Sequence, residues 1–321
     1  MEACKEMKKE RKIISYEVNS EQPIDFPYYL IQGKDVGPSI CITAGIHGCE
    51  YSSIIASMKV YEELSTQKIN GTIKIIPIVN LPAFKGITMF VCPIDNKNLN
   101  GIFPGNNQGS FSERLVYKLF NDFIKDSDYY LDLHGGDLTE KVVPFAYVHK
   151  SNNKKVNEKS KELAENYGTE SIVFTSIDGK PYSDKGFTFS YASENGIPSI
   201  QVEKGGIGQV EDDDVTHHIN GIMNVLKYIG CLEGSIDKNE SPINYYNQYA
   251  YIRSKHEGVF FSQCKIGDQI NEGSELGIVK DYLGNDLEVI VSPYQGKIAM
   301  YNTSPAVKQG GVLFGVLFDQ M

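Results

Sequence analysis

Residues 39–50 read Ser39-Ile-Cys-Ile-Thr-Ala-Gly-Ile-His-Gly-Cys-Glu50, a short apolar run that ends in a glycine-containing loop. Apolar residues recur at near-helical spacing directly after the loop, over residues 50–64. A strand, a loop and a helix in this order are typical of an α/β sheet, whose ligands bind at the carboxyl ends of the strands. The loop can therefore direct the imidazole of His47 and the carboxylate of Glu50 toward one point. On its own, such a pair is equally often two surface polar residues.

Strand-like and helix-like runs alternate from residue 28 to about residue 230. This alternation predicts an α/β domain with a mostly parallel sheet flanked by helices. Further strands are predicted at residues 72–79, 128–133, 144–148, 171–175 and 198–202. Further helices are predicted at residues 112–124, 157–167 and 213–228.

The pattern changes after Gly230. Residues 231–246 are polar and helix-poor, and from residue 250 short apolar runs alternate with glycine turns. Glycine at this density between short apolar runs indicates a small all-β barrel or sandwich. The sequence thus predicts two domains, one over residues 1–235 and a small C-terminal all-β domain over residues 236–321.

The composition limits the classes of partner. The chain of 321 residues has 31 Lys and Arg against 41 Asp and Glu, a formal net charge of −10. A charge of this sign argues against nucleic acid and against an anionic membrane surface as the main partner. The longest apolar run, residues 312–318, is too short to span a bilayer, and the start of the chain has no signal-peptide pattern. We therefore expect neither nucleic acid nor a membrane as partner.

A second histidine ends another predicted strand, in Leu131-Asp-Leu-His-Gly-Gly136. Two histidines and one glutamate, here His47, Glu50 and His134, form the open three-ligand set of a catalytic zinc and leave the fourth position for water. Strand alternation places Asp132 on the same side as His134, so Asp132 is a candidate to orient that imidazole. A plain hydrogen bond from Asp132 to the backbone is an equally open interpretation.

A third strand end supplies a carboxylate, in Gln201-Val-Glu-Lys-Gly-Gly206. Metal-assisted hydrolysis needs a base that takes a proton from water and returns it to the leaving group. We assign this role to Glu203 because its strand ends beside the other two. The alternative is a solvated acid that pairs with Lys204.

These stretches, together with Asn98-Leu-Asn100 and Phe103-Pro-Gly105, resemble the signature stretches of the succinylglutamate desuccinylase/aspartoacylase family. Members are zinc hydrolases with a carboxypeptidase-like catalytic domain, and the region after residue 250 resembles the small β-domain that follows it in many members. The resemblance implies one zinc ion per chain, held by His47, Glu50 and His134. It also implies that Glu203 is the general base and acid in cleaving an amide between an acyl group and an amine.

Two positions depart from the family's pattern. The asparagine stretch usually continues with an arginine that helps to grip the substrate's carboxylate, and Gly101 takes that place here. Met89 takes the place of a second arginine, which is linked to polarising the scissile carbonyl. Loss of an oxyanion donor costs about 3 kcal/mol of transition-state stabilisation. We therefore do not expect an ordinary N-acylaspartate or N-succinylglutamate substrate.

Other polar side chains in these stretches are candidates for substrate binding. We favour Asn98, Asn100 and Lys204, with turn capping an equally open role for the two asparagines. Lys85 and Lys97 lie in the same stretches, but a lysine is a point charge and lacks the bidentate fork of arginine.

Three further features have a more ordinary interpretation. His217 and His218 follow an acidic run, which suggests a second metal site, but we expect the acids to favour the helix N-terminus and the histidines to face solvent. Cys49 is expected to point away from the metal. Tyr147 or Tyr182 is a candidate for a hydrogen bond to substrate.

The sequence thus favours a zinc-dependent hydrolase that deacylates a small N-acylated amino acid or related amine. A metallocarboxypeptidase is the first alternative, although Gly101 removes the cationic grip that it needs. A non-catalytic, metal-retaining binding protein is the second, because Met89 and Gly101 replace both family arginines. The six cysteines lack a Cys-x-x-Cys pair, which favours reduced thiols and a cytoplasmic location. A homo-oligomer stays open.

Overall fold

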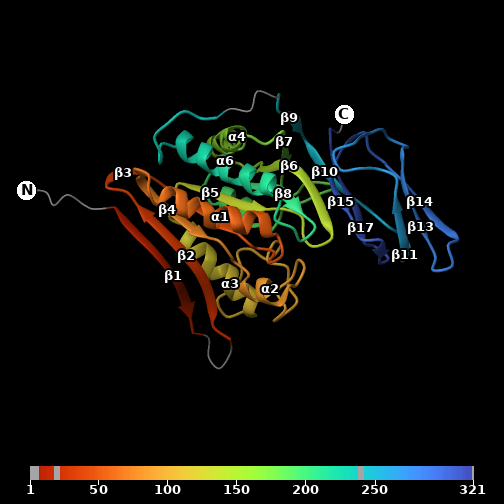
Figure 1. Ribbon diagram of the computed structural model, residues 1–321, viewed down its shortest axis with the longest axis horizontal. Helices are drawn as coiled ribbons and strands as arrows, with labels where there is room; N and C mark the ends of the chain where they lie inside the picture. Colours follow the sequence, from red (N-terminus) through yellow and green to blue (C-terminus); the bar gives the residue numbers. More distant parts are fainter. Residues whose placement is uncertain (1–6, 18–21, 238–241, 320–321) are drawn as a thin grey trace, which may run out of the picture.

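The computed structural model describes residues 7–17, 22–237 and 242–319, and its centre is one large mixed sheet (Figure 1). In spatial order the main path of this sheet runs β1 (Lys8–Tyr16), β2 (Ile24–Gln32), β4 (Asn70–Ile76), β3 (Asp35–Ala44), β5 (Tyr129–His134), β8 (Ser199–Gly206), β6 (Glu140–His149), β15 (Gly296–Asn302), β17 (Val312–Phe318) and β10 (Gln248–Arg253). Three shorter strands join it at the side: β7 (Ser171–Thr175) beside β6, β9 (Asn244–Tyr246) beside β7, and β12 (Gln269–Ile270) beside β15. Strands β4, β3, β5 and β8 run parallel, so their carboxyl ends meet at one edge.

Helices cover both faces of this sheet. One face packs against α1 (Tyr51–Leu64), α4 (Lys154–Tyr167) and α6 (Asp212–Tyr228), and the other against α3 (Phe111–Leu119), the π-helical turn η1 (Phe120–Ile124) and α5 (Thr188–Glu194). Figure 1 shows α4 and α6 on the opposite side of the sheet from α3. Successive residues of β3 divide between the two layers, because side chains of a strand alternate. Ile40 and Ile42 pack with α1 and α6, whereas Cys41 packs with α3.

Local sequence explains where several helices begin. At α3, Ser110 and Glu113 form a capping box, in which Glu113 Oε2 accepts from the Ser110 backbone N–H at 2.8 Å. At α4, the Asn153 side chain accepts from the first backbone N–H groups. The short helix α2 (Leu81–Gly86) begins in the same way, with Asn80 as its cap. The acidic residues that begin α6 favour the positive end of the helix dipole.

The predicted mixed α/β architecture is confirmed, with differences in detail. Strand β7 has the predicted bounds, and α1 begins one residue after the predicted start. The helix predicted at residues 112–124 divides into α3 and η1. The antiparallel pair of β1 and β2 was not predicted, because β1 is an edge strand rich in Lys, Arg and Glu, which masks the apolar alternation of a strand.

The C-terminal strands are divided between two sheets. Strands β10, β15 and β17 extend the large sheet through the pairing of β15 with β6. A separate sheet is formed by four strands in the order β14 (Asp286–Val291), β13 (Glu275–Lys280), β11 (Gly258–Ser262) and β16 (Ala306–Val307). The C-terminal strands of the large sheet and the strands of the separate sheet share one hydrophobic cluster. The all-β character is as predicted, while the boundary at residues 235 and 236 stays a prediction.

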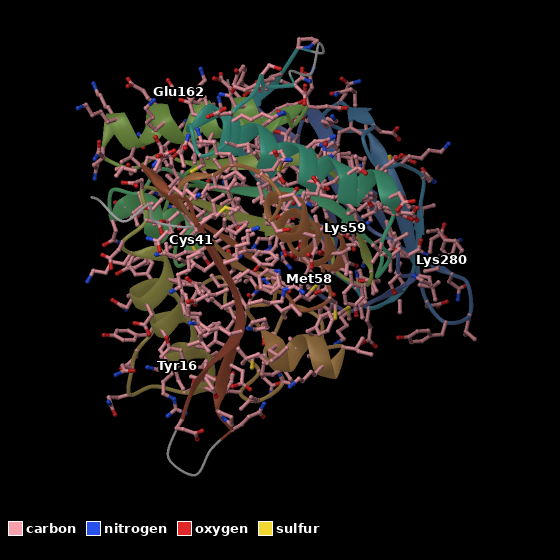
Figure 2. The ribbon with its side chains drawn as sticks, turned by 60° about the vertical axis from the view of Figure 1, so that its left-hand side comes forward. Tyr16, Cys41, Met58, Lys59, Glu162 and Lys280 are labelled. Carbon is pink, nitrogen blue, oxygen red and sulfur yellow. The ribbon has the colours of Figure 1, made fainter. Side chains whose placement is uncertain are left out.

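The hairpin of β13 and β14 forms the outer edge of these strands. Figure 2 labels Lys280 on this hairpin, at the edge of the molecule. Lys280 forms an ion pair with Asp286. Among the described residues, no helix combines the length and the apolar character that crossing a bilayer requires.

Candidate metal centre and active site

Three neighbouring parallel strands bring the candidate site together. His134 is the last residue of β5, and the loop with His47 and Glu50 follows the neighbouring β3. On the other side of β5, the register pairs His134 with Glu203 of β8. The four side chains thus meet at the carboxyl edge of the sheet, as the sequence pattern predicts.

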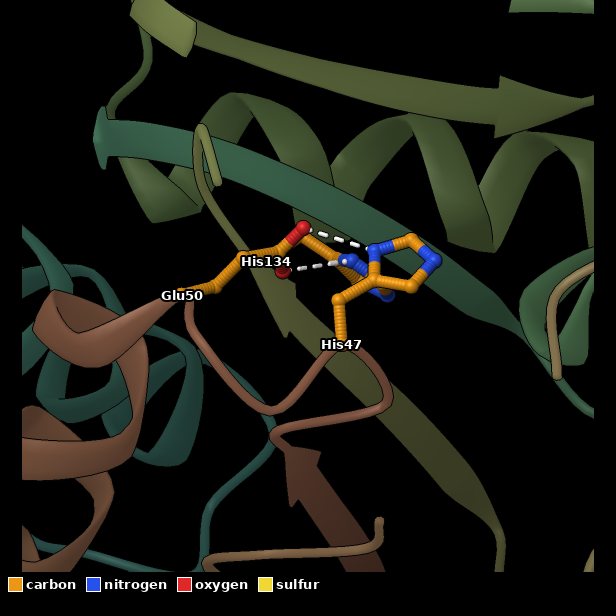
Figure 3. Close-up of side chains that lie close together, drawn as sticks. All are labelled: His47, Glu50 and His134. Atoms are coloured by element: carbon orange, nitrogen blue, oxygen red, sulfur yellow. Dashed lines mark hydrogen bonds and ion pairs between the residues drawn. The ribbon is translucent and has the colours of Figure 1, made fainter. Parts of the chain in front are cut away.

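Glu50 lies between the two imidazoles (Figure 3). Its Oε1 is 2.7 Å from His47 Nδ1, and its Oε2 is 2.9 Å from His134 Nδ1. One ligand atom from each of the three residues lies within 4.8 Å of the others. The side chains are 12%, 4% and 1% exposed for His47, Glu50 and His134. This is a compact, sheltered set of two nitrogen donors and one oxygen donor.

The second nitrogen of each imidazole has a partner. His47 Nε2 lies 3.0 Å from Asn98 Oδ1, and His134 Nε2 lies 3.3 Å from Asp132 Oδ2. Because amide and carboxylate oxygens accept hydrogen bonds, these two partners favour the tautomers with the proton on Nε2, which leave Nδ1 free to bind a cation. The donor set therefore fits a metal ion, and Asp132 occupies the predicted orienting position. Thr43 Oγ1 in turn donates to Asp132 Oδ1 at 2.8 Å.

The electrostatics agree with a cation site. Burial alone would raise the pKa of Glu50, but the charges of His134 and His47 lower it to about 2. Burial opposes protonation of His134, yet Glu50 and Asp132 raise its pKa well above the ordinary value. The pocket thus holds a buried carboxylate that strongly favours positive charge beside it.

Two glycines permit this close approach of chain segments. A Cβ on Gly48 would lie 2.3 Å from the backbone nitrogen of Phe84, at α2. A Cβ on Gly135 would lie 2.4 Å from the carbonyl oxygen of Lys204. The Gly135 backbone N–H also donates to Glu50 Oε2 at 3.2 Å. The glycines beside the two histidines therefore hold the loops against their neighbours.

Glu203 is 9% exposed and lines the same cavity as His47 and Glu50. Its Oε1 accepts a hydrogen bond from Gln201 Nε2 at 2.8 Å. Burial is the largest cause that raises the pKa of Glu203, which reaches about 8. A carboxyl group with a pKa in this range can both hold and release a proton near neutral pH.

Of the three substrate candidates, Asn98 and Asn100 line the cavity, whereas Lys204 is not among its lining residues. Lys204 Nζ is 2.9 Å from Asp214 Oδ1, so Lys204 pairs with α6 and not with Glu203. Asn100 is buried, and its Nδ2 lies 3.4 Å from Gln201 Oε1. Asn98, the third substrate candidate, contacts the ligand imidazole of His47. The structure thus places Asn98 beside His47 and Asn100 beside His134.

The positions of the two missing arginines differ in character. Gly101 has a φ of 120°, and no heavy atom lies within 4 Å of where its Cβ would be. Space is available there, but the backbone conformation disfavours a side chain. The Met89 side chain is 37% exposed. Of the nearby lysines, Lys85 is exposed and Lys97 pairs with Glu113 at 3.1 Å.

The wall of the cavity contains residues that the sequence analysis missed. Tyr147 and Tyr182, the candidates for a hydrogen bond to substrate, line the cavity. The missed residues Glu140, Tyr249 and Tyr251 line it too. The last two come from β10, more than a hundred residues after His134. No local motif marks them, because only the pairing of the C-terminal strands with β6 brings them to the site.

One expectation about histidines outside the site can be compared with the structure. His218 is fully buried, and its Nδ1 lies 2.8 Å from the Tyr167 hydroxyl, so the expectation of a solvent-facing histidine is wrong. The side of α6 that carries it packs against α4, and burial lowers the pKa of His218 to about 4. His149 is a buried histidine whose two nitrogens contact Asp184 and Glu194 at 2.7 and 2.8 Å. Cys49 is buried and is not part of the His-Glu-His group.

Comparisons with known proteins agree with this geometry. A model of the succinylglutamate desuccinylase/aspartoacylase catalytic domain matches residues 36–229. The N-alpha-acetyl-L-2,4-diaminobutyric acid deacetylase of Halomonas elongata is 28% identical over 249 residues, which cover 76% of this chain and 71% of that protein.

Solved structures extend the likeness through the C-terminal strands. The succinylglutamate desuccinylase/aspartoacylase from Rhodobacter sphaeroides superposes with a TM-score of 0.86 at 21% identity, over 98% of this chain and 97% of that chain. The product-bound ectoine utilization protein EutE (DoeB) from Ruegeria pomeroyi superposes with a TM-score of 0.85 at 22% identity, over 97% and 95%. The fold and the family predicted from the sequence are thus confirmed, and the chain belongs to the succinylglutamate desuccinylase/aspartoacylase family.

Proposed function

We propose that this protein is a metal-dependent hydrolase that releases an acyl group from the nitrogen of a small amino acid or related amine. The observation that carries the proposal is the position of Glu203, which lines the same cavity as His47 and Glu50 and is paired in strand register with His134. A site that only binds a metal has no use for such a base. The deacetylase activity named for the Halomonas elongata relative supports the reaction class.

His47, Glu50 and His134 would hold the ion, for which we propose zinc, one per chain. When bound, a zinc ion in such a site lowers the pKa of a water molecule and polarises a carbonyl group. Nδ1 of each imidazole and the carboxylate of Glu50 supply the donors, while Asn98 and Asp132 keep the rings in orientation.

Glu203 moves the protons of the reaction. Gln201 fixes the orientation of its carboxyl group through Oε1, so we assign proton transfer to Oε2. The carboxylate takes a proton from the attacking water and then delivers it to the departing nitrogen. Its raised pKa, about 8, favours the second transfer at neutral pH.

The metallocarboxypeptidase alternative is less well supported. Among the described residues, no lysine or arginine lines the cavity, so a terminal carboxylate lacks a cationic partner there.

The described cysteines support our proposal of a reducing, cytoplasmic location, because all of them are free thiols: Cys41, Cys49, Cys92, Cys231 and Cys264. Cys4 lies outside the described residues.

The experiment is amine release from a panel of N-acetyl amino acids and N-acetyl amines, with the protein as purified, after chelation, and after reloading with zinc. We expect release that chelation abolishes and zinc restores. Release that survives complete removal of metal would contradict metal dependence. Absence of release from every compound by the zinc-loaded protein would contradict the deacylase proposal.

A further inference from the structure

Strand β8 pairs irregularly with β6 directly after Glu203. In the antiparallel register of the two strands, Glu203 pairs with Phe145. Gly205, two residues further on, pairs with Val142, so two residues of β6 lie opposite the single residue Lys204. This is a β-bulge, and one of the two residues is a proline, which has no backbone N–H to donate. The regular pairing with β6 is thus interrupted at the residue after Glu203.

A carboxylate of α6 bridges the two strands at this bulge. Lys204 Nζ lies 2.9 Å from Asp214 Oδ1, and the Nζ of Lys141, in β6, lies 3.4 Å from Asp214 Oδ2. The Asp214 side chain is only 4% exposed, so solvent screens these ion pairs weakly. Each lysine directly follows a glutamate that lines the cavity, Glu203 before Lys204 and Glu140 before Lys141. Asp214 therefore ties β8 to β6 beside the cavity wall.

A histidine of the same helix contacts the backbone of β8. His218 Nε2 lies 3.3 Å from the carbonyl oxygen of Lys204, and His218 Nδ1 lies 2.8 Å from the Tyr167 hydroxyl. Burial lowers the pKa of His218 to about 4, so the ring is neutral near neutral pH. Because a carbonyl oxygen only accepts, Nε2 donates to Lys204 and Nδ1 accepts from Tyr167. Asp214 and His218 are four residues apart and therefore lie on one face of α6.

The end of β8 is closely enclosed between α6 and the loop after β5. A Cβ on Gly205, whose φ is 99°, would lie 3.1 Å from Asp214 Oδ2. On the other side, a Cβ on Gly135 would lie 2.4 Å from the Lys204 carbonyl oxygen. A change in the contacts with α6 is therefore transmitted to the backbone at Lys204, one residue from Glu203.

We propose that Asp214 and His218, called the α6 clamp here, are positioning residues that hold Glu203 in place in the cavity. Neither residue of the α6 clamp lines the cavity, so both act through Lys204. The clamp fixes a strand end that the bulge leaves without regular pairing. This inference rests on the proposed role of Glu203 in proton transfer and names the residues that support it.

The competing interpretation is a purely structural role, in which the α6 clamp stabilises the fold and Glu203 keeps its place without it. The two interpretations differ in kinetics. Displacement of Glu203 slows proton transfer and lowers kcat, while the metal ligands and the other walls of the cavity keep zinc content and KM. A purely structural role lowers the free energy of unfolding and leaves kcat of the folded protein unchanged.

The test measures kcat, KM, zinc content and urea unfolding of Asp214→Asn, with the N-acetyl compound that the wild type hydrolyses fastest. We expect kcat to fall about tenfold or more, because a small misplacement of a catalytic group costs up to about 100-fold. KM should stay within about twofold and zinc at about one ion per chain. The control, Lys227→Met, removes the ion pair of Lys227 with Asp237 in the last turn of α6 and should keep kcat. Unchanged kcat in folded Asp214→Asn, or a loss of zinc that accounts for the fall, would overturn the inference.

Variants of Lys204 test whether Asp214 acts through this lysine. Lys204→Met removes the same ion pair from a partly exposed position, so it tests the contact even if Asp214→Asn does not fold. We expect it to lower kcat like Asp214→Asn, the double variant to fall no further, and Lys204→Arg, which restores the charge, to recover most of the rate. Losses that multiply in the double variant would overturn the inference.

Glu203→Gln in the same assay separates the two proposals. If Glu203→Gln loses turnover while the variants of Asp214 and Lys204 keep it, the α6 clamp is refuted and the role of Glu203 stands. If Glu203→Gln keeps turnover, the proposed role of Glu203 fails and the inference fails with it.

Discussion

Asn98 Oδ1 lies 3.0 Å from His47 Nε2 and also accepts the backbone N–H of Asn100 at 2.9 Å. The second hydrogen bond orients the Asn98 amide, so its oxygen faces the imidazole of His47, a candidate metal ligand. Such outer partners strongly influence metal affinity. Asn98 also lines the cavity, so its contact with substrate stays a prediction.

We expect Asn98→Ala to weaken zinc binding by about 10- to 100-fold, because the His47 ring loses its acceptor. Competition with a chromophoric chelator measures this affinity. Asn152→Ala, in an exposed loop, is the matched control and should bind zinc like the wild type. Equal affinity in Asn98→Ala and the control would show that Asn98 does not orient His47.

Gly48→Ala should disturb the metal centre through the backbone. The added Cβ would lie 2.3 Å from Phe84 N, so the loop with His47 and Glu50 must move. We expect a loss of about 1 to 3 kcal/mol in the free energy of unfolding, together with less than one zinc ion per chain. Gly168→Ala is the control: at a φ of 91° and with open space around it, it costs about 1 kcal/mol but keeps the metal. Full zinc content in Gly48→Ala would contradict the role of this glycine.

The buried contacts of His149 predict a pH dependence of stability. Burial lowers the pKa of His149, but the hydrogen bonds and charges of Asp184 and Glu194 outweigh it, so the pKa is raised overall. A raised pKa in the folded state means that the protonated histidine stabilises the fold fully below the unfolded value, about 6.5. This stabilisation is lost as the pH rises through the folded value.

His149→Gln should therefore reduce the free energy of unfolding by about 3 to 5 kcal/mol at pH 6, and by less at high pH. Urea unfolding at several pH values measures the difference. The exposed His256 supplies the control, His256→Gln, which should follow the wild type. A loss in His149→Gln that is the same at every pH would contradict a protonated His149.

The grouping of His47, Glu50, His134 and Glu203 was predictable because its information is local. Each of the three strand ends carries its own residues, and parallel strands bring their carboxyl ends together whatever the rest of the chain does.

The position of Lys204 was predictable too, although the sequence analysis placed Lys204 among the substrate-binding candidates. Successive side chains of a strand alternate, so Lys204 lies on the opposite face from Glu203 and reaches Asp214 on α6.

The cavity wall was not predictable in the same way. Tyr249 and Tyr251 reach it only because β10 pairs with β17, β17 with β15, and β15 with β6. This order depends on long-range strand pairing, which no spacing of residues encodes. The buried position of His218 likewise depends on how α6 packs against α4.

The most direct test of the account measures bound zinc and amine release in the same preparations of the wild type and Glu203→Gln. Glutamine has nearly the same shape as glutamate but cannot accept the proton of water. We predict about one zinc ion per chain in both proteins and a loss of at least about 100-fold in kcat in the variant. Zinc retained with turnover unchanged would contradict the assignment of Glu203, and wild-type protein that binds no zinc when it is supplied would contradict the metal centre itself.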